Sequence, residues 1–204
     1  VVNAYIQPLM SNYLKKLDQK LLNSGFNCPL LLMTSGGTLT TISSACNNPV
    51  RLLESGPAGG AILATSIAED MNLSKVISFD MGGTTAKITI IENKKAIKAR
   101  EFEVDRKARF KKGSGYPLRI PVIEMVEIGA GGGSIARVNK LEQIITGPDS
   151  AGSFPGPACY SNGGSMPTIT DADLVIGKIN PDNFAGGKIK LSKQLADIAI
   201  TENI

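Results

Sequence analysis

Apolar residues recur at helical spacing in the first part of the chain. Between residues 3 and 24 they stand three and four positions apart, at Ile6, Leu9, Met10, Tyr13, Leu14, Leu17, Leu21 and Leu22. This spacing is typical of a helix with one apolar face. Gly25 follows at a position where helices commonly end. The pattern therefore predicts a helix over residues 3–24.

The clearest β-type pattern lies in the middle of the chain. A β-branched run from Val76 reaches the carboxylate of Asp80, breaks at two glycines and two threonines, and resumes as a second β-rich run to Ile91. This pattern predicts two strands joined by a tight turn at residues 82–85. A shorter apolar run, residues 29–33, predicts a buried strand.

A helix is also predicted over residues 55–71. Ser55 is expected to be its N-cap, with Pro57 in the first turn. The small residues 58–61 favour close packing of this helix against a neighbouring helix. The alternative is an anion bound at a glycine-rich helix start.

Two more helices are predicted in the last part of the chain. Residues 168–177 begin with hydroxyl and acidic side chains, so Thr170 or Asp171 is expected to cap that helix. Residues 191–200 have a second helical pattern. Residues 42–53 fit either a short helix or a loop followed by extended chain.

Further strands are predicted after the central hairpin. Residues 94–104 continue as a β segment, and residues 118–128 alternate as a strand that Pro121 bends or places at a sheet edge. A glycine loop, residues 129–134, then leads to a short β run at residues 135–138. Its glycines superficially match a dinucleotide-binding turn, but no convincing helix follows, which excludes a Rossmann site.

Two loops have unusual compositions. Residues 110–116 are basic and contain glycine, which predicts a mobile or partner-ordered loop. Residues 147–167 are too rich in Gly and Pro for regular elements, yet contain Phe154, Cys159 and Tyr160 as anchors. An ordered, functional loop is therefore predicted over residues 147–167.

Composition places the chain among folded globular proteins. It has 204 residues, of which 42% are hydrophobic and 20% charged. No apolar run approaches the length of a membrane span, so no membrane is expected as partner. The formal net charge is +4, and acidic residues interleave with the basic residues between 87 and 112. This mixture indicates a solvated face and argues against a nucleic-acid partner.

Cysteine and histidine content limits the possible chemistry. The three cysteines are odd in number and lack metal-type spacing, which favours a reduced, cytoplasmic setting. The chain has no histidine, which excludes a Ser-His-Asp or Cys-His mechanism and a histidine-ligated metal within it. Carboxylates, hydroxyls, backbone N–H groups, basic side chains or a bound metal must therefore do any chemistry.

Three strand ends lead into glycine–hydroxyl loops, at residues 34–38, 82–85 and 129–134. Successive N–H groups in such loops can bind an anion, and threonine hydroxyls can add donors. We expect the three loops to converge on one polyanionic ligand, a nucleotide. Asp80 is placed to hold Mg²⁺ through water or to orient a nucleophile. The alternative for each loop is a plain turn.

Asp171 and Asp173 are acidic residues with two interpretations. At the start of a predicted helix they suit a capping role, which favours a structural interpretation. The alternative is a catalytic or metal-binding role.

Several motifs in order resemble the hydantoinase A / 5-oxoprolinase family and cover most of the chain from about Leu31 onward. They are Ser55-Gly-Pro-Ala-Gly-Gly60, Phe79-Asp-Met-Gly-Gly-Thr-Thr85, Gly113-Ser-Gly-Tyr-Pro117, Glu127-Ile-Gly-Ala-Gly-Gly-Gly-Ser-Ile-Ala136, Gly147-Pro-Asp-Ser-Ala-Gly152, Pro155-Gly-Pro-Ala-Cys-Tyr160 and Pro167-Thr-Ile-Thr-Asp-Ala-Asp-Leu-Val-Ile-Gly177.

The resemblance implies a fold and an activity. The fold would be an α/β, actin-like or sugar-kinase-like ATPase lobe (ribonuclease H-like), with a mixed sheet flanked by helices. The activity would be that of an ATP- and Mg²⁺-dependent hydrolase opening a cyclic amide, such as a hydantoin or 5-oxoproline, by phosphoryl activation of a carbonyl. Such chemistry rests on positioning and charge stabilisation, which need no histidine. A hydantoinase B-type partner subunit or domain is also implied.

Site residues follow from the matching positions. Asp80 and Asp171 would be the catalytic residues, with Asp80 also the metal-orienting carboxylate, although the resemblance assigns Asp171 no step. The nucleotide would be bound by Gly82, Gly83, Thr84, Thr85, Gly131, Gly132, Gly133 and Ser134.

The chain also departs from the family pattern. The family's first lobe, with its own phosphate motif, and its C-terminal remainder have no counterpart within residues 1–204, and Arg137 stands where relatives tend to have an aromatic residue. We therefore expect a hydantoinase A-type domain that is a piece of a longer protein, with weak nucleotide binding and no turnover alone. The alternatives are a subunit of an acetone- or acetophenone-type carboxylase, a small-molecule kinase, and a non-catalytic nucleotide-binding module of the same fold.

Overall fold

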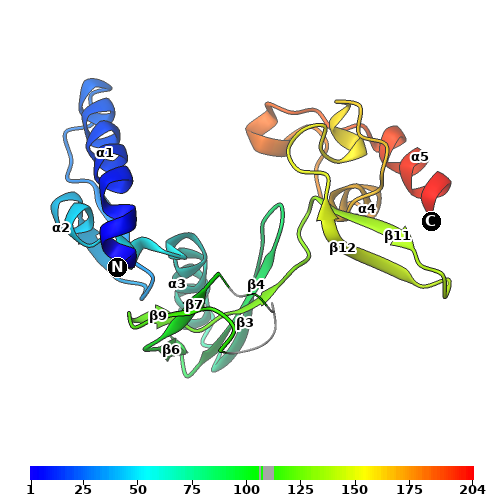
Figure 1. Ribbon diagram of the computed structural model, residues 1–204. Coiled ribbons are helices and arrows are strands. Elements are labelled where there is room, and N and C mark those ends of the chain that lie inside the picture. Colours follow the sequence, from blue (N-terminus) through cyan, green and yellow to red (C-terminus); the bar gives the residue numbers. More distant parts are fainter. Residues whose placement is uncertain (106, 108–112) are drawn as a thin grey trace. The chain divides into compact units, whose positions relative to one another are not determined.

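A computed structural model describes residues 1–105, 107 and 113–204 (Figure 1). The chain divides into two compact units. The first unit comprises residues 1–78 and 89–125, and the second comprises residues 79–88 and 126–204. The loop predicted over residues 110–116 lies partly outside the described residues. Among the described residues, no helix is both long and apolar enough to cross a membrane.

The first unit begins with the predicted helix, α1 (Val2–Asn23). The segment with two possible interpretations forms two short helices, α2 (Ile42–Asn47) and η1 (Pro49–Leu52), and the Thr41 side chain caps α2. Leu14 of α1 is buried against Ala45 and Cys46 of α2. The short helices therefore cover only part of the apolar face of α1, since Leu9, Tyr13 and Leu22 are exposed.

Helix α3 (Ser55–Asp70) confirms the next predicted helix but differs in two details. Its N-cap is Glu54, whose backbone is left-handed (φ 57°), and not Ser55. Among the described residues, its small side chains pack on strands, where a neighbouring helix was expected. Ala58 and Ala61 are buried in a cluster with Ile123 of β9 (Val122–Ile123). Small side chains thus let α3 approach strands closely.

The strands form several small antiparallel sheets. In the first unit β1 (Leu31–Met33) pairs with β2 (Leu39–Thr41), β6 (Lys98–Ala99) with β9, and β7 (Phe102–Val104) with β8 (Tyr116–Leu118). Strand β1 was predicted to be buried, but Leu31 is 48% exposed.

The central hairpin is confirmed as β3 (Lys75–Met81) and β4 (Ala86–Glu92). Its sheet has the order β10-β4-β3, where β10 is Val126–Ile128, and β5 (Lys95–Ala96) also pairs with β4. Each pairing with a defined register is antiparallel. The α/β character is confirmed, but the expected mixed sheet is not found among the described pairings. Short connections explain this difference, since parallel neighbours need long crossovers.

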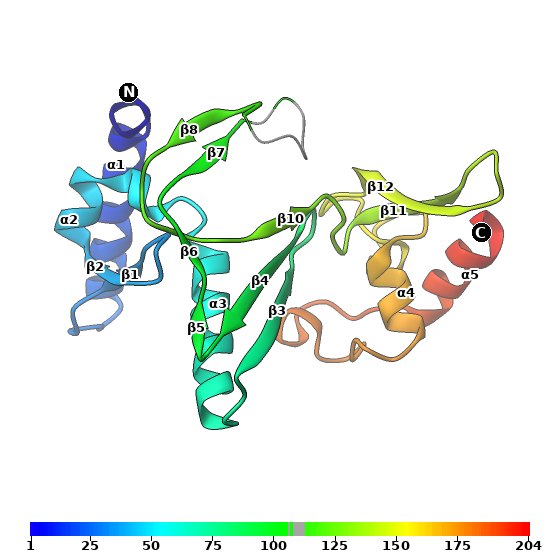
Figure 2. The same ribbon diagram turned by 90° about the horizontal axis from the view of Figure 1, so that it is seen from below.

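The second unit combines the tip of the central hairpin with the last part of the chain. Its other elements are β11 (Ser134–Val138), β12 (Ile144–Ser150), η2 (Ala158–Tyr160), α4 (Ile169–Val175), η3 (Phe184–Gly187) and α5 (Lys193–Asn203). Helices α4 and α5 lie on one side of the β11–β12 hairpin (Figure 2). The core of the unit consists of Cys159, Leu174, Leu191 and Ala196. The two predicted C-terminal helices are therefore confirmed as α4 and α5.

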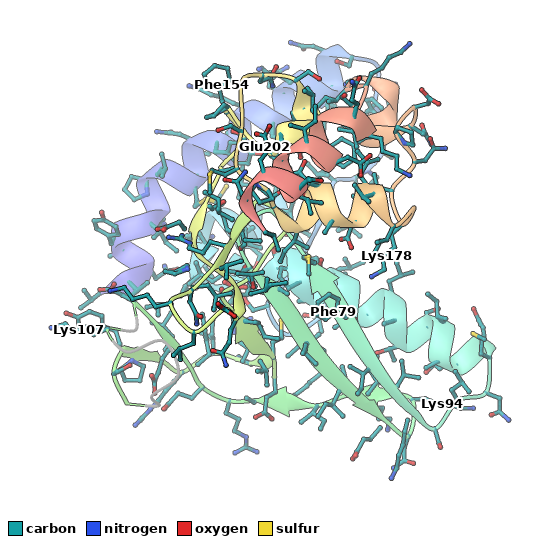
Figure 3. All side chains as sticks on the ribbon, turned by 90° about the vertical axis from the view of Figure 1, so that its right-hand side faces the viewer. Phe79, Lys94, Lys107, Phe154, Lys178 and Glu202 are labelled. Atoms are coloured by element: carbon teal, nitrogen blue, oxygen red, sulfur yellow. The ribbon has the colours of Figure 1, made fainter. Side chains whose placement is uncertain are left out.

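The segment predicted as a functional loop has only one of its expected anchors fully buried. Cys159 is completely buried, whereas Phe154 is 81% exposed and its side chain points away from the chain (Figure 3). Phe154 is therefore not an anchor. The prediction assigned Phe154 to the core on its apolar side chain alone, but an apolar residue is often exposed.

Candidate functional site

Two of the three glycine loops interlock in the second unit. The N–H of Gly132 donates to the carbonyl of Gly82 at 2.9 Å, and the N–H of Gly133 donates to the carbonyl of Gly83 at 2.8 Å. A Cβ added to Gly131 would lie 2.5 Å from the backbone nitrogen of Thr84. Glycine is needed here because two backbones meet without room for a side chain.

The two loops differ in the donors that they leave available. The N–H groups of residues 131–134 are all used, by the Ser134 hydroxyl, Gly82, Gly83 and Gly131 respectively. The N–H groups of Gly83 and Thr84 have no hydrogen-bond partner within the described residues. Donors for an anion therefore come from the 82–85 turn, and the 131–134 loop supplies a closely fitted support.

The third loop, residues 34–38, belongs to the first unit. The hydroxyl and N–H of Ser35 both donate to the carbonyl of Arg51, and the N–H of Thr34 donates to Thr38. A Cβ on Gly37 would lie 2.7 Å from the Ile62 side chain. These local bonds account for the loop, which agrees with the plain-turn alternative.

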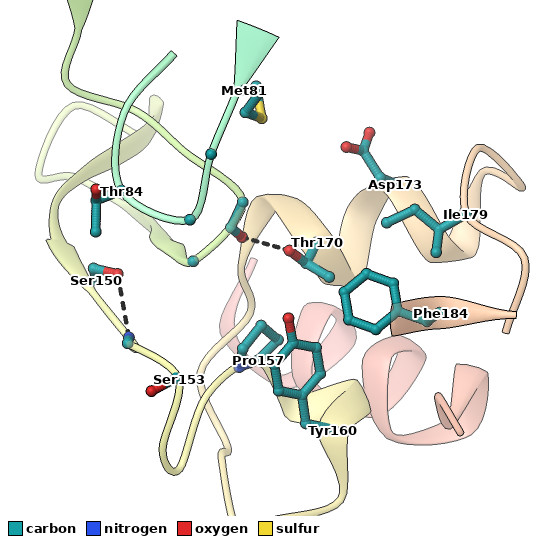
Figure 4. Close-up of a pocket in the computed structure, with 15 residues that line it drawn as sticks. Met81, Thr84, Ser150, Ser153, Pro157, Tyr160, Thr170, Asp173, Ile179 and Phe184 are labelled. Atoms are coloured by element: carbon teal, nitrogen blue, oxygen red, sulfur yellow. Dashed lines mark hydrogen bonds between the residues drawn. The ribbon is translucent and has the colours of Figure 1, made fainter. Parts of the chain in front are cut away.

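A cavity of about 600 Å³ lies beside the interlocked loops, entirely within the second unit (Figure 4). It is lined by Met81, Gly82, Gly83, Thr84, Gly132, Gly133, Ser150, Gly152, Ser153, Pro157, Tyr160, Thr170, Asp173, Ile179 and Phe184. The rings of Tyr160 and Phe184 pack at a centroid distance of 5.6 Å. One wall is therefore aromatic, and another consists of glycine backbone and hydroxyls.

Helix α4 is tied directly to the glycine loop. Both the N–H and the hydroxyl of Thr170 donate to the carbonyl of Gly132, each at 2.8 Å. Asp173, one turn further along α4, also lines the cavity and pairs with Lys178 at 3.6 Å. Helix α4 thus binds the glycine wall through Thr170 and contributes the Asp173 carboxylate to the cavity.

Tyr160 presents a neutral phenol to the cavity. Burial, followed by the neighbouring Cys159 and Asp171, raises the pKa of Tyr160. Its hydroxyl is directed into the cavity in Figure 4. A phenol that stays protonated can donate a hydrogen bond to a ligand.

Asp80 does not line the cavity, although its neighbour Met81 does. Successive residues of a strand point to opposite faces, and Asp80 is exposed on β3. The structure therefore places Asp80 next to the 82–85 turn but on the other face of its strand.

Asp171 is completely buried and is also absent from the cavity lining. Its carboxylate accepts hydrogen bonds from the N–H groups of Ala158 (3.3 Å), Cys159 (2.8 Å) and Thr168 (2.8 Å), and from the Thr168 hydroxyl (2.8 Å). Thr168 is the N-cap of α4, and Asp171 completes a capping box. The N-cap of α4 is thus Thr168, and not Thr170 or Asp171 as predicted. Asp171 still takes part in capping, because its side chain completes the capping box.

The sequence prediction missed several residues of the cavity. Tyr160 lies in a loop that composition had marked as functional, and Thr170 lies in a quoted motif. Asp173 was not missed, because the sequence offered a catalytic or metal-binding role for it as an alternative. Ile179 and Phe184 line the cavity without any sequence signal. Arg137 pairs with Asp149 and does not line the cavity.

We expect Cys159 to resist thiol reagents while Cys28 reacts. Burial, with a hydrogen bond to Asp171, strongly raises the pKa of the Cys159 thiol, so the reactive thiolate is scarce even at pH 8. Cys28 is exposed. Mass spectrometry of the native protein after iodoacetamide treatment at pH 8 measures both sites. Equal labelling of Cys28 and Cys159 would contradict the burial of Cys159, and urea-unfolded protein is the control.

Known proteins resemble this chain over its whole length. An uncharacterized protein of Methanocaldococcus jannaschii is 46% identical over 99% of this chain, and caprolactamase subunit alpha of Pseudomonas jessenii is 34% identical over 100% of it. The matched regions are 30% and 28% of those relatives, so the chain spans less than a third of their length.

A solved structure of acetone carboxylase, described as ATP-dependent and nucleotide-free, matches 94% of this chain and 26% of its own with a TM-score of 0.71 at 28% identity. The chain thus has a mixed α/β fold that matches this acetone carboxylase chain. The family described as Hydantoinase/oxoprolinase matches residues 1–204. On these grounds the chain belongs to the hydantoinase/oxoprolinase family.

Proposed function

We propose that this chain carries the nucleotide-binding part of an ATP-dependent hydrolase that opens a cyclic amide. The cavity of the second unit supports the proposal most, because it combines an aromatic wall with a glycine–hydroxyl turn. Caprolactamase, a relative with 34% identity, is named for a cyclic amide. Hydantoin-type and 5-oxoproline-type rings are the substrates that we infer.

The cavity suits a nucleotide in size and chemistry. Its volume of about 600 Å³ lies within the range of small-molecule sites. Tyr160 and Phe184 offer ring faces on which a base can stack. The N–H groups of Gly83 and Thr84, with the hydroxyls of Thr84 and Thr85, are candidate donors to phosphate oxygens. We therefore assign the base to the aromatic wall and the phosphates to the turn.

Asp80 is the residue that we infer to hold Mg²⁺. Among the described residues, no group of three or more acidic or cysteine side chains could form a protein cage for a metal. Mg²⁺ usually keeps several waters and uses one or two carboxylates with substrate phosphates. Asp80 is exposed two residues before the turn, on the face of β3 away from the cavity, so we infer that it would hold the metal through water. Bound Mg²⁺-ATP would supply the phosphoryl group that activates the amide carbonyl.

The proposal includes an architecture and a partner. We infer that the second unit belongs to an actin-like, sugar-kinase-like ATPase lobe, whose companion lobe would complete the site. The caprolactamase relative is named as subunit alpha, which supports a partner subunit of the hydantoinase B type. In this arrangement the turn and the aromatic wall bind the nucleotide, and the cyclic amide is bound elsewhere in the assembly.

Calorimetry of Mg²⁺-ATP binding to the complete gene product tests the metal assignment. We expect Asp80→Asn to weaken binding roughly tenfold or more, because a ligating group loses its charge. Asp173→Asn is the matched control, since Asp173 lines the cavity but already pairs with Lys178. If only Asp173→Asn weakens Mg²⁺-ATP binding, Asp173 and not Asp80 is the carboxylate that holds the metal. No ATP binding by the unchanged protein would refute the proposed function.

A ketone carboxylase is the second candidate, supported by the TM-score of 0.71 with acetone carboxylase. Phosphate release measured with a cyclic amide, and separately with bicarbonate and a ketone, distinguishes the two reactions. ATP use that requires the cyclic amide supports the hydrolase, whereas a requirement for bicarbonate and ketone supports the carboxylase. Binding without hydrolysis under either condition would indicate a regulatory module.

A further inference from the structure

We propose that Asp171 is a positioning residue that joins the two walls of the cavity. Its buried carboxylate connects the segment that carries Tyr160 to the helix that carries Thr170 and Asp173. The ligand in the proposal is ATP, so this inference rests on the proposed function.

The first wall is held through backbone groups. The Asp171 carboxylate accepts the N–H of Ala158 at 3.3 Å and the N–H of Cys159 at 2.8 Å. These residues lie between Pro157 and Tyr160, which both line the cavity. Tyr160 is therefore attached to a backbone whose N–H groups bind a completely buried carboxylate.

The second wall is held through the start of α4. The same carboxylate accepts the N–H and the hydroxyl of Thr168, each at 2.8 Å. Thr170, next along the helix, donates twice to the carbonyl of Gly132, whose own N–H donates to Gly82. A series of hydrogen bonds thus leads from the 82–85 turn through α4 to the Tyr160 segment.

Joining the two walls through a buried carboxylate has a free-energy cost. Taking a charge out of water is costly unless strong hydrogen bonds compensate. Four donors converge on Asp171, and they come from both walls. Capping α4 alone requires only the bonds to Thr168. The additional bonds to Ala158 and Cys159 are what a positioning role explains.

Asp171→Asn keeps the shape of the side chain but places an amide N–H₂ where N–H donors converge. We expect hydrogen exchange at residues 158–160 to become about tenfold faster, since local opening costs less when a bond network is broken. Exchange in α1, which belongs to the first unit, should stay unchanged, and Asp197→Asn, an exposed carboxylate on α5, is the control variant. Unchanged exchange at residues 158–160 would overturn the inference whether or not ATP binds.

A double-mutant cycle then tests whether Asp171 acts through Tyr160. In the complete gene product we expect Tyr160→Ala and Asp171→Asn each to weaken Mg²⁺-ATP binding about tenfold, the value of one lost stacking contact. The double variant should bind no more than about twofold more weakly than Tyr160→Ala, because the effects share a cause. A multiplicative, roughly hundredfold loss would show independent effects and overturn the inference.

Thr168 offers a second route if Asp171→Asn does not fold. Thr168→Val removes the hydroxyl that donates to Asp171, whereas Thr168→Ser retains it. We expect Thr168→Val to speed exchange at residues 158–160 and Thr168→Ser to behave as the unchanged protein. Equal behaviour of the two variants would contradict the inference. If the unchanged protein does not bind ATP but exchange is faster in Asp171→Asn, the proposed function is refuted and the connection through Asp171 is not.

Discussion

Asp171→Ala should destabilise the second unit by about 3–5 kcal/mol, because a buried acceptor with several donors disappears at once. The N–H groups of Ala158, Cys159 and Thr168 and the Thr168 hydroxyl would lose their partner. These groups are shielded from bulk water, since Asp171 and Thr168 are completely or almost completely buried. The melting temperature should fall by about 10 °C or more.

Thermal unfolding followed by circular dichroism measures this effect. Asp173→Ala is the matched control, because Asp173 lies on the same helix and its partner in the ion pair, Lys178, has a side chain that is 70% exposed. Exposed pairs contribute about 0–1 kcal/mol, so the control should melt close to the unchanged protein. Similar melting temperatures for the two variants would mean that the bonds to Asp171 contribute little to the stability of the unit.

Gly131→Ala should cost about 2–3 kcal/mol, because overpacking forces atoms apart that cannot easily move. The new Cβ would lie 2.5 Å from the nitrogen and 2.6 Å from the carbonyl carbon of Thr84. Both are backbone atoms, so the 82–85 turn itself must shift. We expect nucleotide affinity to fall together with stability, since this turn provides the free N–H donors.

Gly83→Ala is the control for Gly131→Ala. Gly83 belongs to the same pair of loops, yet an added Cβ there meets nothing within 4 Å. Its stability should stay within about 0.5 kcal/mol of the unchanged protein. Denaturant unfolding of both variants measures the difference, and equal midpoints would show that the two loops do not lie as closely as described.

Local patterns predicted most helices and the central hairpin. The stripe in α1 and the β-branched runs of β3 and β4 depend on neighbours in the sequence, and they specify the element directly. The predicted ends of the helices were less accurate. Glu54 caps α3 through a left-handed backbone, and Thr168 caps α4 through a box completed by Asp171. Several residues at each start suit a cap, and the tertiary structure selects one.

The candidate site was predicted in part. The sequence placed Gly82 and Gly83 in a tight turn and predicted that three glycine loops would converge on one ligand. Residues 82–85 and 131–134 do contact each other, and their convergence on a ligand stays a prediction. The loop at residues 34–38 has the same composition, yet it bonds to Arg51 in the first unit. Composition alone does not distinguish a loop that faces a cavity from a loop whose hydrogen-bonding groups are used by nearby residues.

By itself, the sequence determined the family, the α/β elements and the glycine–hydroxyl turn after Asp80, because ordered motifs and local periodicity are properties of the chain. Only the tertiary structure decided that Asp171 is buried, that Tyr160 and Phe184 form an aromatic wall, and that Gly131 touches Thr84. These contacts join segments far apart in the chain. Burial and hydrogen bonding between such segments emerge only when the chain packs.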